Sequence, residues 1–288
     1  MKRREMLLSA GAALAGLSAL PTRWIAAADR KKQKVLYFTR SAGFEHSVVK
    51  RSGDQLSHSE KILTELGREH GFEVECTKDG AVFDGDLVKF DAIAFYTSGD
   101  LTKPCNQPGQ PMSQGGLKRL LDAVAGGKGF VAFHAASDSF HSHGSQITPY
   151  IAMLGGEFVS HGPQQVATQT VTSPGFPGME GLGRSFKLNE EWYALKNFAQ
   201  DLHVILVQET EGMQGDCYQR PPFPATWARR HGQGRVYYTS LGHREDIWTN
   251  PMVQKIILGG LAWAFGNARA EIPPNLEKVT PQAGQMHR

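Results

Sequence analysis

The first half of the chain alternates short apolar segments with helical segments, and this alternation constrains the fold more than any other feature. Apolar stretches rich in strand-forming residues lie at 34–39, 72–76, 91–97 and 129–133. Between them, residues 57–70 place apolar side chains at helical spacing before Gly71, and residues 114–125 form a second helical segment. Strands separated by helices pair in parallel, so the sequence predicts a doubly wound α/β fold with a mainly parallel sheet flanked by helices.

The second half of the chain is less regular. Helical patterns cover residues 148–154 and 250–265, the latter with Pro251 in its first turn, where a missing N–H costs nothing. Further strands are expected at 166–172, 192–195, 204–209, 225–229 and 235–240. Because no repeat or linker interrupts the pattern, residues 29–270 are predicted to form one domain, followed by a polar surface extension over 271–288.

Residues 1–28 have the pattern of an export signal. Lys2-Arg3-Arg4 precedes an uncharged run over residues 6–20, and the small residues 26–28 offer a cleavage site. The arginine pair favours the twin-arginine route, although Lys2 and Met6 depart from that pattern. An uncleaved anchor is the alternative, but the run is shorter than the roughly 20 residues that a membrane span needs. We therefore expect an exported protein, periplasmic or extracellular, with no stable membrane insertion after cleavage.

Net charge and cysteine content limit which partners and which disulfides can be expected. The formal net charge is only +3, and no Lys/Arg stripe alternates with aromatic residues, so nucleic acid is not expected as a partner. Cys76, Cys105 and Cys217 form no C-x-x-C pair. Their spacing leaves open one disulfide with a spare thiol, or three inert thiols.

The segment 129–138 indicates where the active site lies. A buried strand runs into a turn of small residues, with His134 at the bend. Ligands bind at the carboxyl ends of strands in open α/β sheets. Histidine at such a place can transfer protons or bind a metal near neutral pH. Asp138 either orients His134 or caps the following helix.

Other polar side chains follow other predicted strands and should meet His134 at the same edge of the sheet, in one cleft. We assign His134, Glu191 and His243 to acid–base chemistry, with Asp138 orienting His134. The residues expected to contact substrate are His46, Tyr96, His161, Trp192, Tyr193 and Trp248. The tryptophans and Tyr193 either stack on a sugar ring or pack in the core.

A metal ion is a further hypothesis for this cleft. Several histidines with a carboxylate can hold a divalent metal such as zinc, and His134, His161 and His243 are the candidate ligands. The chain contains no H-E-x-x-H motif, and ligands so far apart cannot be verified from their spacing. The sequence therefore leaves the cofactor open.

Two reaction classes are excluded by the residue at the bend. An amidotransferase of this fold needs a cysteine nucleophile there, and a serine hydrolase needs a G-x-S-x-G turn. Here the position is held by His134. No glycine-rich phosphate loop follows the first strand either.

The chain resembles the ThuA-like, trehalose-utilisation family. The matching segments lie at 39–47, 129–140, 150–161, 190–193 and 232–263, in the family's order. The resemblance implies a flavodoxin-like fold, similar to that of class I glutamine amidotransferases. It also implies a cleft built from His46, His134, His161, Glu191 and His243. A proline-containing loop at 101–115 departs from the family's pattern.

The family resemblance implies a substrate class, namely disaccharides and in particular sugars oxidised to 3-keto forms. A keto group acidifies the neighbouring C–H, so a His/Glu pair could drive isomerisation or elimination, and a metal would polarise the ketone oxygen. We therefore hypothesise an enzyme, a hydrolase, lyase or isomerase acting on a small carbohydrate. The alternative is a non-catalytic sugar-binding module that partners a sugar oxidoreductase. The sequence predicts no oligomeric state.

Overall fold

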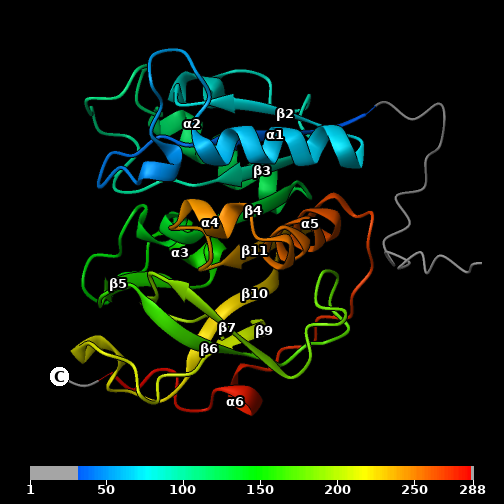
Figure 1. Ribbon diagram of the computed structural model, residues 1–288. Coiled ribbons are helices and arrows are strands. Elements are labelled where there is room, and N and C mark those ends of the chain that lie inside the picture. The colour runs from blue at the N-terminus through cyan, green and yellow to red at the C-terminus, as the bar shows by residue number, and fades with distance from the viewer. Residues whose placement is uncertain (1–31, 287–288) are drawn as a thin grey trace, which may run out of the picture.

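The computed structural model describes residues 32–286, so the predicted export signal at 1–28 lies outside the described residues. Within this range, nine strands form one sheet in the order β2-β1-β3-β4-β11-β10-β9-β6-β7, and β5 pairs with β8 in a small second sheet (Figure 1). The strands are β1 (Gln33–Phe38), β2 (Phe72–Thr77), β3 (Ala92–Phe95), β4 (Gly129–Phe133), β5 (Glu157–His161), β6 (Gln165–Val171), β7 (Ser185–Glu190), β8 (Tyr193–Lys196), β9 (His203–Gln208), β10 (Phe223–His231) and β11 (Gly234–Thr239).

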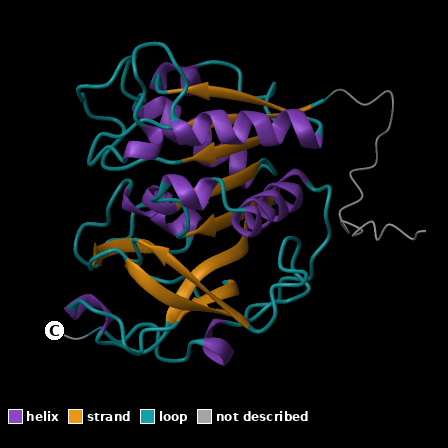
Figure 2. Ribbon diagram, in the orientation of Figure 1, coloured by secondary structure: helices purple, strands orange, loops and turns teal. Residues whose placement is uncertain are grey.

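The half of the sheet from β2 to β11 is parallel throughout, which confirms the predicted α/β class. Helices cover both faces of this half (Figure 2). They are α1 (His58–His70), α2 (Gln114–Ala125), α3 (Pro149–Leu154), α4 (Glu245–Trp248) and α5 (Pro251–Phe265). Strands covered on both faces must be apolar along their whole length, and every residue of β3 and β4 is buried.

Beyond β11 the sheet continues with antiparallel strands. β10 pairs with β11 and β9, and β6 joins β9 to the edge strand β7. β7 alternates exposed and partly buried residues, as expected for a strand with one solvated face. The sequence predicts no strand over residues 185–190, so β7 is a difference between the predicted and the observed fold.

Local signals set the helix ends where the sequence predicted them. Ser57 caps α1 in a capping box with Glu60, and Gly71 ends the helix in the left-handed conformation. Thr148 caps α3, and Asn250 caps α5 with Pro251 in the first turn. The four predicted helices therefore end at the observed residues and begin at most one residue early.

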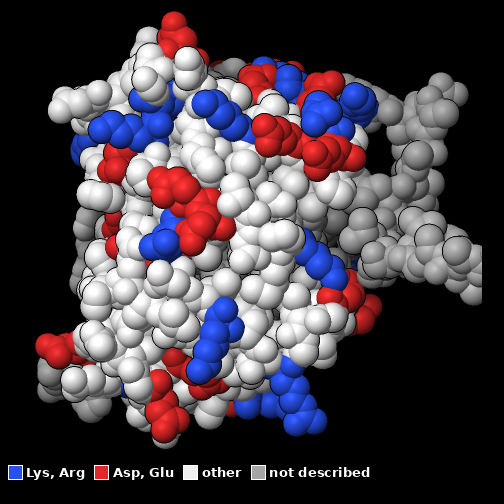
Figure 3. Space-filling view, in the orientation of Figure 1, with Lys and Arg blue, Asp and Glu red and all other residues white. Residues whose placement is uncertain are grey.

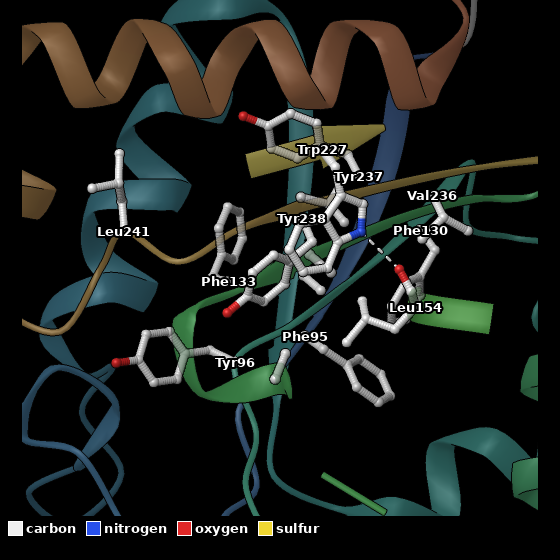
Figure 4. Close-up of a cluster of buried hydrophobic side chains, with 14 of the residues drawn as sticks. Phe95, Tyr96, Phe130, Phe133, Leu154, Trp227, Val236, Tyr237, Tyr238 and Leu241 are labelled. Carbon is white, nitrogen blue, oxygen red and sulfur yellow. Dashed lines mark hydrogen bonds between the residues drawn. The ribbon is translucent and has the colours of Figure 1, made fainter. Parts of the chain in front are cut away.

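Aromatic side chains fill much of the core between the sheet and its helices (Figure 4). Phe95 and Phe130 lie 5.1 Å apart between ring centroids, and Trp227 stacks on Tyr238 at 4.2 Å. The Trp227 indole N–H donates to the carbonyl of Leu154 at 2.8 Å, so its one polar atom is satisfied. This packing fixes the strand ends that carry the candidate site.

The C-terminal residues 271–286 lie against the antiparallel half. The short helix α6 (Leu276–Val279) buries Leu276, and the Asn275 Oδ1 accepts a hydrogen bond from the backbone N–H of Val204 at 2.6 Å. Among residues 32–286, no helix has both the length and the apolar character to cross a bilayer. On the face shown in Figure 3, basic side chains are interspersed with acidic ones.

Candidate functional site

Four loops bring His46, His134, Glu191 and His243 together at the edge of the sheet. His46 follows β1, His134 begins the 3-10 turn η3 (His134–Asp138) directly after β4, and His243 follows β11. Glu191 lies between β7 and β8. Each side chain offers one ligand atom, and these four atoms lie within 4.8 Å of one another. Residues up to 197 positions apart in the sequence thus form one cluster, the His/Glu cluster.

The carboxylate of Glu191 lies at the centre of the His/Glu cluster. Its Oε2 is 3.0 Å from His243 Nδ1, 3.4 Å from His134 Nε2 and 3.9 Å from His46 Nε2. Its Oε1 is 3.3 Å from Nδ1 of His161. Burial opposes ionisation of Glu191, but hydrogen bonding from neighbouring imidazole N–H groups, such as Nδ1 of His243, holds its pKa far below its usual range. Glu191 is therefore ionised.

The orientation of the His134 ring is set by the backbone conformation of His134 and by the carbonyl of Ser240. Its φ of 39° is unusual for a non-glycine residue and marks a strained bend, a feature common at functional sites. The Nδ1 lies 2.7 Å from the carbonyl oxygen of Ser240. Because a carbonyl only accepts, Nδ1 carries the proton and Nε2 presents a lone pair in the neutral ring.

The environment keeps His134 neutral. The ring is fully buried, and burial lowers its pKa to about 3. Its Nε2 has no hydrogen-bond partner in the described structure and faces Glu191 Oε2. Two acceptors therefore point at each other in a buried place, which is costly unless a proton or a cation lies between them.

Two tyrosines complete the interior of the site. The Tyr193 hydroxyl is 3.2 Å from His46 Nε2, and its ring centroid is 4.0 Å from that of His134. Tyr96 packs against the rings of His46 and His134, and its buried hydroxyl has no partner among the described residues. Burial lowers the pKa of His46 and raises that of Tyr96, so both are neutral near pH 7.

His161 is the accessible histidine of the group. Its side chain is 44% exposed, whereas that of His134 is fully buried. The His161 ring stacks on Tyr193 at an interplanar angle of 15°. Its Nδ1 lies 3.0 Å from the carbonyl oxygen of Gly162 and therefore carries the proton in the neutral ring, which leaves Nε2 as an acceptor.

Among the described residues, the Asp138 side chain forms its hydrogen bond with His141 and none with His134. The Asp138 carboxylate contacts His141 Nε2 at 2.6 Å, and His141 Nδ1 contacts Glu157 at 3.0 Å. These two carboxylates raise the pKa of His141. The group that orients His134 is the carbonyl of Ser240, which a sequence motif of side chains cannot reveal.

The two tryptophans expected to contact substrate are core residues. Trp192 and Trp248 are both fully buried, and their indole N–H groups donate to the carbonyls of Gln165 at 2.9 Å and Gly242 at 2.7 Å. Neither ring offers a free face to a sugar, so that expectation is corrected. Trp248 instead holds the loop that carries His243.

Sequence reasoning also missed Glu190 and Gln164. Burial raises the pKa of Glu190 to about 7. Its carboxylate accepts hydrogen bonds from backbone N–H groups in the loop of His243. The side-chain amide of Gln164 bridges His243 Nε2 at 2.9 Å and the guanidinium of Arg244 at 2.7 Å. The adjacent pair Glu190-Glu191 in the sequence was the available signal, but only Glu191 was assigned a role.

The proline-containing loop lies beside the segment that carries His46. Gln107 accepts the backbone N–H of Ser41 at 2.7 Å and donates to Glu45 at 2.6 Å. The buried guanidinium of Arg40 donates to the carbonyl of Pro108 at 3.0 Å. The loop is thus bound to the first strand and its following turn, close to the site.

Comparison with known proteins places the chain in a family. The model of the ThuA family, described as trehalose utilisation, matches residues 34–264. No curated protein matches this chain. ThuA-like proteins of Bacteroides uniformis and Parabacteroides merdae superpose with a TM-score of 0.61 each at 17% identity. The first alignment covers 81% of this chain and 91% of the other, and the second 89% and 97%.

A more distant structure has the same fold. A cytoplasmic protein of Salmonella typhimurium superposes with a TM-score of 0.51 at 14% identity, over 80% of this chain and 98% of that one. Identities this low establish the fold alone. The match to the family model covers most of the chain, and the chain therefore belongs to the ThuA, trehalose-utilisation family.

Proposed function

We propose that this protein is a carbohydrate-active enzyme that binds a divalent cation at the His/Glu cluster and uses it to act on an oxidised sugar or disaccharide. The observation that carries the proposal is the bare, buried Nε2 of His134, which faces the ionised carboxylate of Glu191 at 3.4 Å. A cation between these two acceptors removes their conflict.

The donor set fits zinc. Three imidazole nitrogens and one carboxylate oxygen are zinc ligands in proteins. A metal-bound histidine usually donates its second N–H to a carbonyl or carboxylate, as His134 does to Ser240. Burial lowers the pKa of His46 and of His134, so both rings are in the neutral form that a metal requires.

A bound divalent cation would polarise a carbonyl oxygen of the substrate or lower the pKa of a water molecule. The protein's own contribution is to place proton carriers beside that oxygen. His161 suits this role because its Nε2 is a free acceptor on a half-exposed ring, and its Nδ1 is tied to a carbonyl. Next to a keto group, this nitrogen would remove the acidified C–H proton.

The proposed substrate class is inferred from the family to which the chain belongs. Its description as trehalose utilisation supports a disaccharide or a sugar derived from one. Proton transfer next to a keto group leads to isomerisation or to elimination of a glycosidic substituent, so we favour a lyase or isomerase over a simple hydrolase. We also propose export, which the arginine pair and apolar run of residues 2–20 support.

Metal analysis and product analysis together test the proposal. Purified protein should contain one zinc or similar ion per chain, and His134→Ala should lose both the ion and turnover of keto-disaccharides. The exposed variant Glu65→Gln, on α1, serves as a control that keeps both. Binding of the sugar without its conversion would instead support a non-catalytic binding module. Full activity of a metal-free protein would refute the proposal that a cation takes part.

A further inference from the structure

Glu190 is a fully buried carboxylate whose two oxygens both accept hydrogen bonds from the backbone. Its Oε1 accepts the N–H of Glu191 at 2.8 Å. Its Oε2 accepts the N–H of Gly242 at 3.0 Å and that of His243 at 3.2 Å. The three donors thus belong to two members of the His/Glu cluster and to the glycine between His243 and the end of β11.

These contacts demand a carboxylate rather than an amide. An amide side chain has one acceptor oxygen, and its NH2 group would face a backbone N–H. Across residues 32–286, no Lys or Arg forms an ion pair with Glu190, although a buried charge is costly without one.

The loop that Glu190 holds serves the His/Glu cluster twice. It carries the side chain of His243, and the carbonyl of Ser240 within it orients His134. Both backbone polar groups of Gly242 are hydrogen-bonded: its N–H donates to Glu190, and its carbonyl accepts from Trp248. Gly242 adopts a φ of 129°, which favours glycine.

We propose that Glu190 is a positioning residue that fixes the loop of His243 and the backbone of Glu191 for binding of a divalent cation. This inference rests on the cation site proposed above. It differs from a purely structural role in one respect: replacing one acceptor oxygen of Glu190 weakens cation binding as well as the fold.

The variant Glu190→Gln tests this inference with Zn²⁺ as the probe. Residues that support metal ligands typically contribute about 10–100-fold to metal affinity, so calorimetry should show a loss of that size. The melting temperature of the metal-free variant should fall, since the NH2 group of the new amide faces a backbone N–H. The Zn²⁺-induced rise in melting temperature should shrink.

Glu157→Gln is the matched control. Glu157 is also fully buried and accepts the backbone N–H of Ser142 and the amide of Asn197, but it lies outside the His/Glu cluster. This variant should lower the melting temperature of the metal-free protein and leave Zn²⁺ affinity unchanged.

Three outcomes would overturn the inference. Equal Zn²⁺ affinity of wild type and Glu190→Gln removes the positioning role while leaving the cation site intact. Equal losses of melting temperature with and without Zn²⁺ make Glu190 purely structural. If Glu190→Gln does not fold, Glu190→Asp keeps the charge but shortens the side chain, and undiminished affinity in that variant refutes the role. A wild type that binds no divalent cation refutes the proposed function itself.

Discussion

Replacing Glu191 by Gln should stabilise the metal-free protein while it destroys the cation site. The amide NH2 can donate to the bare Nε2 of His134, which now faces a carboxylate oxygen at 3.4 Å. Leaving such a buried acceptor unsatisfied costs about 1–3 kcal/mol. The same NH2 faces the Nδ1–H of His243, which loses its acceptor, so the net gain in stability should be smaller than that amount. For a domain of this size, the full amount would correspond to roughly 2–12 °C, so the melting temperature should rise by less than about 12 °C.

The same substitution removes the response to zinc. A ligand present at about 100 times its Kd stabilises a protein by about 2.7 kcal/mol, or roughly 5–11 °C here. We expect the wild type to show such a rise between chelator and Zn²⁺, and Glu191→Gln to show none. Thermal unfolding with and without Zn²⁺ measures both effects, and Glu65→Gln, which neutralises an exposed carboxylate, is the control. A variant that melts lower without metal yet keeps the zinc response would refute the reasoning.

Three further predictions concern the proton carrier, acid stability and the loop of His243. His161→Ala should abolish turnover of a keto-disaccharide and leave zinc content unchanged in elemental analysis; loss of zinc would make His161 a ligand instead. Burial opposes ionisation of Glu60, but hydrogen bonds, including two from Arg51, lower its pKa below 4.5. Its stabilisation is therefore present above about pH 4.5 and lost as pH falls through the folded pKa. Urea unfolding of Glu60→Gln should show a weaker dependence on pH in that range than wild type, and parallel curves would contradict this. Trp248→Phe leaves the Gly242 carbonyl without its donor and should cost about 1–3 kcal/mol in urea unfolding, with an unchanged midpoint as the contrary result.

The parallel half of the fold could be predicted because its signals are local. Each buried strand is a short apolar run, and caps such as Ser57 and Gly71 mark the helix ends. The edge strand β7 was missed because half of its residues are polar and exposed. Its alternation of Phe186 and Leu188 with polar neighbours was present, but such short patterns are also common in loops.

The site was predictable as far as topology determines it. His134 and His243 follow parallel neighbours β4 and β11, so their convergence follows from strand order alone. The groups that orient them were not predictable, because backbone atoms such as the carbonyl of Ser240 leave no trace in residue types. The prediction that the two tryptophans contact substrate was wrong for a related reason. The sequence does not indicate whether a Trp that follows a strand turns its ring into the core, as Trp248 does.

The position of Glu191 on the chain has a mechanical consequence. It lies on the short crossing from β7 in the large sheet to β8 in the two-stranded sheet, whereas three of its imidazole neighbours are carried by loops of the large sheet. Rotation of the small sheet against the large one would therefore move the carboxylate relative to those rings. A molecule bound against β5 and β8 would therefore change the geometry of the proposed cation site without contacting His46, His134, Glu191 or His243.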